Sequence, residues 1–225
     1  EINLRYADAL TMADRHAIYK NGAKEIAALS GVALTFMAKY SMDEVGSSCH
    51  LHSSVWSADG SESLMWDEAA PHHMSGTMRG WLGGIIATGA EFAWMFAPYV
   101  NSYKRYQPES WAPTALAWGR DNRTCGYRIV GHGAGFRMES RVPGADVNPY
   151  LAYAATIAAG LHGIEAGLEP GEPFAGNAYA DDSLDRVPHT LVDAITAFER
   201  SEIARAAFGD EVHHHLLNTA RQEWN

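Results

Sequence analysis

Charged residues occupy every second position of residues 136–141, which read Phe-Arg-Met-Glu-Ser-Arg. In a β-strand, side chains at alternate positions share one face, so a strand here places Arg137, Glu139 and Arg141 side by side. A carboxylate between two guanidiniums suits a site that holds a metal ion and an anionic ligand together, because the carboxylate can bind Mg²⁺ and the guanidiniums can bind carboxylate or phosphate. An exposed strand face with self-cancelling charge gives the same pattern. The run alone therefore predicts a strand and leaves its function open.

The chain is expected to have an α+β fold, in which mixed, largely antiparallel strands carry the site and helices pack outside. Alternating patterns predict five further strands, at residues 1–6, 32–39, 47–56, 114–118 and 126–130. Apolar residues spaced three and four apart predict helices that begin at Thr11, Ser75 and Pro149, and two shorter ones over residues 190–198 and 210–224. The glycine-rich connection at residues 131–135 predicts a hairpin and not a dinucleotide site, because no helix follows it.

Two of these helices carry expectations about packing. The helix capped by Ser75 is expected to run to Ala97, where Pro98 stops it. Its glycines indicate a close approach of another backbone; they are Gly80, Gly83, Gly84 and Gly89. The helix that Pro149 opens is expected to turn one stripe of apolar residues toward the core: Leu151, Ala154, Ala155, Ala158 and Leu161.

Length and composition exclude several classes of protein. The 225 residues, 47% hydrophobic and 20% charged, can bury one sizeable core. The formal charge of −10 argues against general nucleic-acid binding, and no apolar stretch reaches the roughly 18 residues that a membrane-spanning helix needs. Two cysteines, Cys49 and Cys125, cannot form a disulfide framework, which fits a reducing cytoplasm. The arginines cluster at residues 105–141, and such a basic patch in an acidic chain suits an anionic small molecule.

Two histidines on one predicted strand are further candidate ligands. Alternation along residues 47–56 puts His50 and His52 on one face, where imidazoles can bind a metal ion or phosphate oxygens. The pair at residues 72–73 is expected to be solvated. The three histidines at residues 213–215 are expected to be an incidental polar run, because consecutive positions on a helix point in different directions.

Five short segments carry this chemistry in a fixed order along the chain. They are Gly-Ser-Ser-Cys-His-Leu-His at residues 46–52, Asn-Ser-Tyr-Lys-Arg at 101–105, Trp-Gly-Arg-Asp-Asn-Arg at 118–123, Arg-Met-Glu-Ser-Arg at 137–141 and Asn-Pro-Tyr-Leu at 148–151. The series resembles the catalytic domain of the glutamine synthetase family, strongly from residue 1 to about residue 171 and weakly after residue 180. Several separate motifs in the right order are far more specific than any one of them.

The resemblance implies an ATP-dependent ligase. Family members phosphorylate the γ-carboxylate of glutamate, and an amine then displaces phosphate from the acyl phosphate. Divalent ions, Mg²⁺ or Mn²⁺, bridge the phosphates and the carboxylate, as phosphoryl transfer requires. The implied ligands are glutamate, ATP and an amine, and the implied assembly is a homo-oligomeric ring, most often a dodecamer of two hexamers.

By the same resemblance, ten residues match functional positions of the family. The metal ligands match Glu1, His50 and Glu139. The positions that line the nucleotide match His52 and Ser54. The arginines that neutralise phosphate charge during transfer match Arg123 and Arg128. The positions that hold the glutamate substrate match Gly46, Arg105 and Arg141.

Two departures from the family pattern lie near the expected amine and glutamate sites. Ammonia-using members have a glutamate in the sequence Tyr-Glu-Ala-Pro, where this chain has Trp111, and an asparagine where it has Val45. These changes resemble the branch that joins glutamate to putrescine, polyamines or ethanolamine, so Trp111 is expected to bind an alkylamine. An ammonia-using synthetase and a non-catalytic family member remain as alternatives. Tyr179 falls where some members are adenylylated, but its flanking residues differ.

Residues 1–225 are expected to be the C-terminal part of such a catalytic domain. Glu1 begins in the middle of a pattern, and the resemblance implies a smaller N-terminal β-domain and further metal-ligand glutamates before it. In the family, the active site forms between one subunit's catalytic domain and its neighbour's N-terminal domain. Residues 1–225 alone are therefore expected to be inactive.

Overall fold

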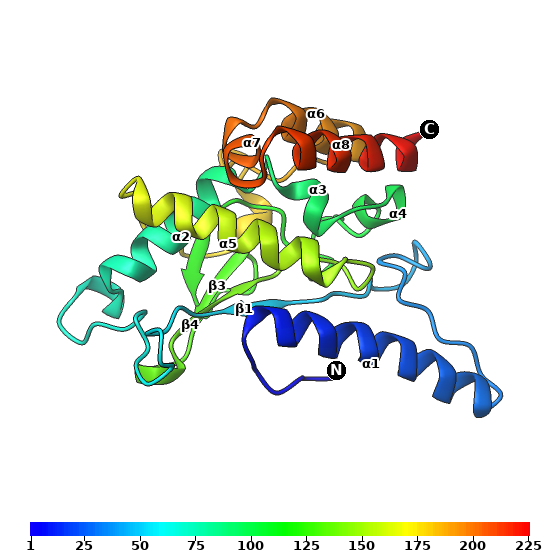
Figure 1. The fold of residues 1–225 in the computed structure, drawn as a ribbon, viewed down its shortest axis with the longest axis horizontal. Helices are drawn as coiled ribbons and strands as arrows, with labels where there is room; N and C mark the ends of the chain where they lie inside the picture. Colours follow the sequence, from blue (N-terminus) through cyan, green and yellow to red (C-terminus); the bar gives the residue numbers. More distant parts are fainter.

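A four-stranded mixed sheet lies at the centre of the structure, a computed structural model that describes residues 1–225 (Figure 1). The strand order is β1-β4-β3-β2, with bounds Leu51–Ser53, Arg137–Ser140, Tyr127–Val130 and Trp118–Arg120. β4 pairs antiparallel with β1 and β3, whereas β2 and β3 run parallel. The prediction of an α+β fold with a mixed sheet is confirmed.

A tight hairpin joins β3 to β4 and so positions β4, the strand that carries Arg137 and Glu139. Its tip is the 3-10 helix η2, Gly133–Gly135. Gly131 has a left-handed φ of 86°, and a Cβ there would lie 2.0 Å from the carbonyl oxygen of Gly135, so only glycine fits. The predicted hairpin at residues 131–135 is confirmed.

Two helices meet through glycine-rich faces beside the sheet. α2, Gly76–Thr88, begins at Ser75, whose hydroxyl accepts a hydrogen bond from Met78 N, and it packs against α5, Pro149–Glu165. A Cβ on Gly84 would lie 2.1 Å from the carbonyl oxygen of Ala159. Backbones this close leave no room for a side chain, as the glycine spacing predicted.

The helix predicted over residues 75–97 is interrupted, so its predicted length is wrong. α2 ends at Thr88, and a second helix, α3, covers only Ala93–Phe96. Glycine disfavours a helix interior by about 1 kcal/mol. Gly89 stands at the end of α2, where a Cβ would lie 2.5 Å from Leu116 Cδ2. Gly89 itself keeps helical angles, φ −58° and ψ −34°, and residues 89–92 separate the two helices.

α5 turns the predicted stripe toward the core in part: Leu151, Ala154 and Ala158 are partly buried against the core. Its fully buried residues are mostly small: Pro149, Ala152, Ala155, Thr156, Ala159, Gly160 and Gly163. Of the predicted inward residues only Ala155 is fully buried, and Leu161 is 48% exposed. Close contact with α2 needs small side chains, so the larger leucine turns outward.

The first 45 residues contain one helix and no strand. α1, Ala9–Leu29, is capped by Asp8, whose carboxylate accepts from Thr11 N at 3.0 Å, so the predicted cap at Thr11 is wrong. The strands predicted at residues 1–6 and 32–39 are absent. A strand needs a neighbour to take its backbone hydrogen bonds, and no strand of the sheet pairs with these segments. Their large apolar side chains are consequently exposed.

Two other predicted strands are shorter or displaced. Within residues 47–56 only Leu51–Ser53 forms a strand, and the strand predicted at 114–118 begins at Trp118 instead. In residues 114–116, Leu116 N donates to the carbonyl oxygen of Asp185 and the carbonyl oxygen of Thr114 accepts from Val187 N, so only the carbonyl oxygen of Ala115 bonds toward β3, at Gly126. As a result Arg120 lies on β2 and not in the following loop.

Three C-terminal helices form a layer at the end of the molecule opposite α1 (Figure 1). α6, Leu191–Arg200, and α8, Asp210–Trp224, were predicted, whereas α7, Glu202–Phe208, was not. His213 is buried against Phe198, with ring centroids 4.7 Å apart, and its Nε2 lies 2.9 Å from the carbonyl oxygen of Phe198. This histidine is therefore part of the packing. No helix combines the length and the hydropathy needed to cross a membrane.

Candidate active site

The carboxylate of Glu139 is the centre of a buried cluster of charged side chains. Glu139 lies within β4 and is 3% exposed. Its Oε1 accepts from Arg141 Nη1 at 2.9 Å and lies 3.1 Å from His50 Nδ1, while its Oε2 accepts from Arg128 Nη1 at 2.9 Å. Strand alternation places Arg141 beside it, and the sheet register places Arg128 opposite it on β3. Four sequence-predicted residues thus meet at one point.

The cluster keeps Glu139 ionised. Burial by itself would raise the pKa of this carboxyl group, but hydrogen bonds from His50 and Arg128 and the charge of Arg141 outweigh it. The result is a pKa well below the ordinary value. Glu139 therefore carries a full negative charge inside the sheet, balanced by two guanidiniums.

The second histidine lies on the same side of β1 as the cluster. His52 Nε2 is 4.0 Å from Glu139 Oε1, and its Nδ1 accepts from Arg137 Nε at 3.1 Å. Burial lowers the pKa of His52, which favours the neutral ring. Ser54 is exposed, and its hydroxyl accepts from Trp56 Nε1 at 2.9 Å. The structure thus brings His52 and Arg137 to the charged cluster and leaves Ser54 open to solvent.

His50 has the geometry that a metal-bound histidine adopts. Its Nδ1 faces Glu139, whereas its Nε2 is buried and has no hydrogen-bond partner. Carboxylates commonly orient a ligating histidine in this way, so His50 fits a divalent ion. Glu139 could offer an oxygen ligand only to a second ion, because it faces the other ring nitrogen of His50, and two guanidiniums already engage its carboxylate.

The third predicted metal ligand, Glu1, is not gathered with the other two. Its side chain is exposed and forms no hydrogen bond or ion pair. Across residues 1–225, no three His, Cys, Asp or Glu side chains form a group that could hold a metal ion. That Glu1, His50 and Glu139 bind metal therefore stays a prediction. Of the three, the fold brings together His50 and Glu139.

Arg105 is buried beneath the charged strand. It follows the short helix α4, Val100–Tyr103, and is 1% exposed. Its guanidinium donates to Ser48 Oγ at 3.2 Å and to the carbonyl oxygens of Arg141 and Val142. A Cβ on Gly46 would lie 2.6 Å from Arg105 Cγ, so a glycine at that position makes room for this arginine. Gly46 and Arg105 are therefore in contact, as members of one predicted site should be.

Three buried donors near this point lack partners. They are Arg105 Nε, Arg141 Nε and Tyr179 Oη. The charges of both arginines act on the Tyr179 hydroxyl and oppose the rise in its pKa that burial causes. Unpaired buried polar groups are costly, and three donors together are what an anionic ligand such as a carboxylate would satisfy.

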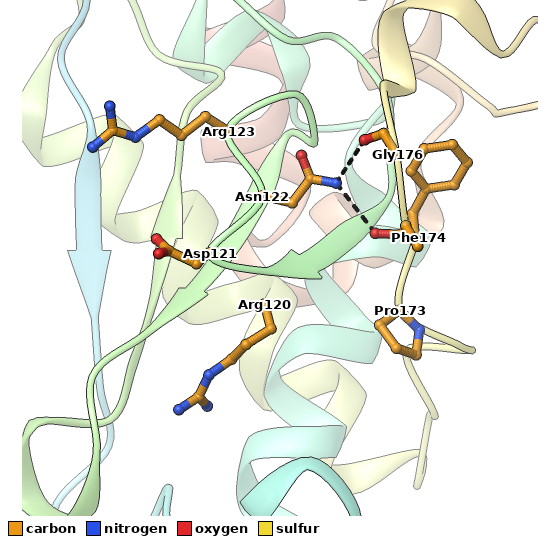
Figure 2. Close-up of a pocket in the computed structure, with 8 residues that line it drawn as sticks. Arg120, Asp121, Asn122, Arg123, Pro173, Phe174 and Gly176 are labelled. Atoms are coloured by element: carbon orange, nitrogen blue, oxygen red, sulfur yellow. Dashed lines mark hydrogen bonds between the residues drawn. The ribbon is translucent and has the colours of Figure 1, made fainter.

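The two predicted phosphate-binding arginines have different surroundings in this structure. Arg128 is tied to Glu139 and to Asp121, whereas Arg123 is exposed and makes no hydrogen bond or ion pair. Arg123 lines a pocket of about 580 Å³ together with Arg120 and the segment 173–176. Figure 2 shows the side chains of Arg120 and Arg123 pointing in different directions, while Asn122 bonds to the carbonyl oxygens of Phe174 and Gly176.

The segment after Arg105 carries Trp111 in an unusual backbone conformation. Trp111 has a left-handed φ of 61° and is 62% exposed, and Glu109 has a φ of 55°. Neither is glycine, so both positions are strained. Asn177 Nδ2 donates to Glu109 Oε1 at 3.2 Å and so holds the segment against the loop that contains Tyr179.

Sequence reasoning missed two carboxylates of this region. Asp121 pairs with Arg128, and Glu109 lies two residues before Trp111. The signal for Asp121 was its place within the arginine-rich run 118–123. An arginine that binds no ligand needs a carboxylate as its counter-ion. For Glu109 the sequence held no periodic signal, because it lies in an irregular loop.

The glutamine synthetase catalytic domain matches the whole chain, residues 1–225. This chain belongs to the glutamine synthetase family. Among its relatives, the gamma-glutamylethanolamide synthetase GlnA4 of Streptomyces coelicolor is 55% identical over 223 residues, which cover 99% of this chain and 47% of that protein. The glutamate–isopropylamine ligase of a Pseudomonas species is 43% identical over 218 residues, 96% of this chain and 47% of that protein.

A solved structure supports the same assignment. The GmaS/ADP complex, in its conformation 1, superimposes with a TM-score of 0.89 at 35% sequence identity, and the match covers 99% of this chain and 52% of that one. The glutamine synthetase fold predicted from the motifs is therefore confirmed for these residues. The chain spans about half the length of the relatives that it matches.

Proposed function

We propose that the full-length protein is an ATP-dependent ligase that joins the γ-carboxylate of glutamate to an amine through a γ-glutamyl phosphate. The observation that carries this proposal is the buried cluster in which Glu139 meets His50, Arg128 and Arg141. Phosphoryl transfer needs preorganised positive charge beside a carboxylate that can bind a divalent ion. Membership of the glutamine synthetase family supports the same chemistry.

Each residue of the site has a proposed role. Arg123 and Arg128 stabilise the charge of the transferred phosphate, while Arg105 and Arg141 hold glutamate. His52 and Ser54 line the nucleotide. His50 and Glu139 would hold divalent ions, Mg²⁺ or Mn²⁺, which would supply neutralisation of the charge that develops during transfer. Glu139 becomes a better metal ligand when an anionic substrate draws one of its two arginines away.

The acceptor that we propose is a primary alkylamine. Two relatives are, by name, a gamma-glutamylethanolamide synthetase and a glutamate–isopropylamine ligase. Trp111 is exposed on the segment that follows Arg105. An indole can pack against methylene groups and attract a cation with its π face. Ammonia has no methylene groups to gain from that contact. Ethanolamine, putrescine and longer polyamines all combine a primary ammonium group with methylene groups.

The assembly and the compartment are part of the same proposal. We infer a homo-oligomeric ring, a dodecamer in the form most common for the family, in the reducing cytoplasm. Both cysteines are free, which suits a reducing compartment. Light scattering of the full-length protein tests the ring, since a monomer or dimer would be far smaller.

A coupled assay of ADP release tests the function. The full-length protein receives ATP, glutamate and Mg²⁺ with ammonia, methylamine, isopropylamine, ethanolamine or putrescine. We expect ADP release to depend on both glutamate and amine, and kcat/KM to be higher for an alkylamine than for ammonia. If ammonia is the best acceptor, the protein is an ordinary glutamine synthetase. If no acceptor supports turnover, it is a non-catalytic member of the family.

A further inference from the structure

Two strained residues lie on one short segment that contacts the Tyr179 loop through Glu109. Glu109 and Trp111 have φ values of 55° and 61°. Left-handed backbone at residues other than glycine persists only where its surroundings hold it, and such residues often cluster at ligand sites. The segment is anchored at its start, because Ser110 Oγ donates to the carbonyl oxygens of Arg105 and Gln107. Two side chains of opposite character, a carboxylate and an indole, are thereby fixed two residues apart.

Asn177 connects this segment to Tyr179. Its Nδ2 donates to Glu109 Oε1 at 3.2 Å, and its Oδ1 accepts from Tyr179 N at 3.0 Å. The same residue caps the 3-10 helix η3, Ala178–Ala180. One amide side chain therefore sets the position of Glu109 relative to Tyr179.

Charges of both signs act on the hydroxyl of Tyr179. Burial raises its pKa, Arg141 and Arg105 lower it, and Glu109 raises it. The hydroxyl itself is buried and has no partner. Glu109 is the carboxylate among the three charged groups that act on this phenol, and its Oε2 accepts no hydrogen bond in the structure.

The region around Tyr179 contains positive groups, Arg105 and Arg141, and one negative group, Glu109. The guanidiniums of Arg105 and Arg141 suit the anionic substrate and repel a cation. An alkylamine is cationic at neutral pH until it loses its proton, so it requires a negative group and an apolar surface. Glu109 and the exposed indole of Trp111 supply both on the segment that Asn177 ties to the Tyr179 loop.

We propose that Glu109 determines acceptor specificity by binding the ammonium group of the alkylamine, with the alkyl part lying against Trp111. The inference rests on the proposed ligase function and adds a residue that selects the cationic acceptor. Binding by Glu109 raises the local concentration of the amine before deprotonation, and the reaction at the acyl phosphate then proceeds as described above. Glu109 thus acts on amine binding and leaves glutamate and ATP binding unchanged.

The test uses two substitutions of Glu109 in the full-length protein. Glu109→Gln keeps the size and the oxygen that accepts from Asn177 but removes the charge. Glu109→Gly removes the side chain and suits the left-handed backbone, so it relieves strain and protects against misfolding. Glu172→Gln is the control, because Glu172 is an exposed glutamate of the loop after α5 and has no ion pair.

Steady-state kinetics with two acceptors separates the proposal from a structural role. For ethanolamine or isopropylamine we expect both Glu109 variants to raise the amine KM about tenfold or more, the scale of a hydrogen bond to a charged group. The KM values for glutamate and ATP should stay unchanged. For hydroxylamine, which is uncharged at neutral pH, the KM should also stay unchanged.

The outcomes distinguish this inference from the proposed function. An unchanged alkylamine KM in both variants, or an equal loss with hydroxylamine, overturns the role of Glu109 while the ligase function stands. Absence of ADP release by the wild-type protein with every acceptor overturns the ligase function itself. Glu172→Gln should match the wild type throughout.

Discussion

Arg128 and Glu139 are direct cross-strand neighbours, and their side chains meet with 2.9 Å between Nη1 and Oε2. The pair joins the strand that carries the predicted metal ligand to the strand that carries a predicted phosphate ligand. Arg141 and His50 engage the other carboxylate oxygen. Glu139 therefore joins three other residues of the site through one side chain.

Removal of the Glu139 carboxylate should affect stability and metal dependence together. Glu139→Ala leaves Arg141 and Arg128 without their anion inside the sheet, and breaking a buried pair costs about 3 kcal/mol. We also expect activity at limiting Mg²⁺ to be lost. Denaturant unfolding and Mg²⁺ titration measure the two effects. Glu199→Ala, which breaks the exposed pair with Arg221, should cost less than about 1 kcal/mol. Wild-type activity of Glu139→Ala at limiting Mg²⁺ would refute the metal role.

The depressed pKa of Glu139 predicts how stability changes in acid. The folded pKa lies far below the ordinary value of about 4.3, so the stabilisation is fully present above that value. As pH falls below about 4, the unfolded chain binds a proton that the folded chain does not, and stability declines by about 1.4 kcal/mol per pH unit. Unfolding curves of wild type and Glu139→Gln should therefore converge below pH 4. A difference that is constant between pH 7 and pH 3 would contradict the shift.

The two phosphate arginines should behave differently when removed. Arg123→Ala should lower kcat by about a hundredfold with little change in stability, because Arg123 is exposed and unpaired. Arg128→Ala should lower kcat similarly and also destabilise the protein, because it leaves Glu139 with fewer partners. The control variant is Arg120→Ala. Arg120 is an exposed arginine of the pocket that Arg123 lines, and its loss should leave kcat unchanged. A change confined to the glutamate KM would assign Arg123 and Arg128 to substrate binding.

Trp111→Glu should shift the acceptor preference toward ammonia. The substitution replaces an exposed indole by a carboxylate that can attract ammonium but cannot pack against methylene groups. The ratio of kcat/KM for an alkylamine to that for ammonia is the quantity to measure, and we expect it to fall at least tenfold even where total activity is low. An unchanged ratio would remove Trp111 from the acceptor site.

The contact between α2 and α5 predicts opposite effects for two glycine substitutions. Gly84→Ala should destabilise the protein by more than about 1 kcal/mol, since its Cβ would lie 2.1 Å from the carbonyl oxygen of Ala159. Gly22→Ala, inside α1 with nothing within 4 Å of its Cβ, should stabilise it by about 0.5 kcal/mol. Thermal unfolding distinguishes them. Equal shifts for both variants would mean that the two helices separate easily.

The parts of the fold that were predicted correctly depend on local rules. The strand at Arg137–Ser140, the hairpin at residues 131–135 and the helix Asp210–Trp224 follow from alternation, glycine and apolar spacing. The wrong predictions depend on neighbours. Residues 1–6 and 32–39 alternate like strands but have no partner in the sheet, and α5 buries small residues because α2 approaches it there.

The sequence by itself determined the chemistry of the site, because its motifs name the residue types and because alternation puts Glu139 and Arg141 on one face. Only the tertiary structure decided which of these residues meet. Sheet register brought Arg128 to Glu139, the chain path left Arg123 exposed and Glu1 apart, and Asn177 tied Glu109 to the loop of Tyr179. The physical reason is that side-chain direction along a strand is fixed locally, whereas contacts between distant segments depend on packing and pairing that no short stretch of sequence specifies.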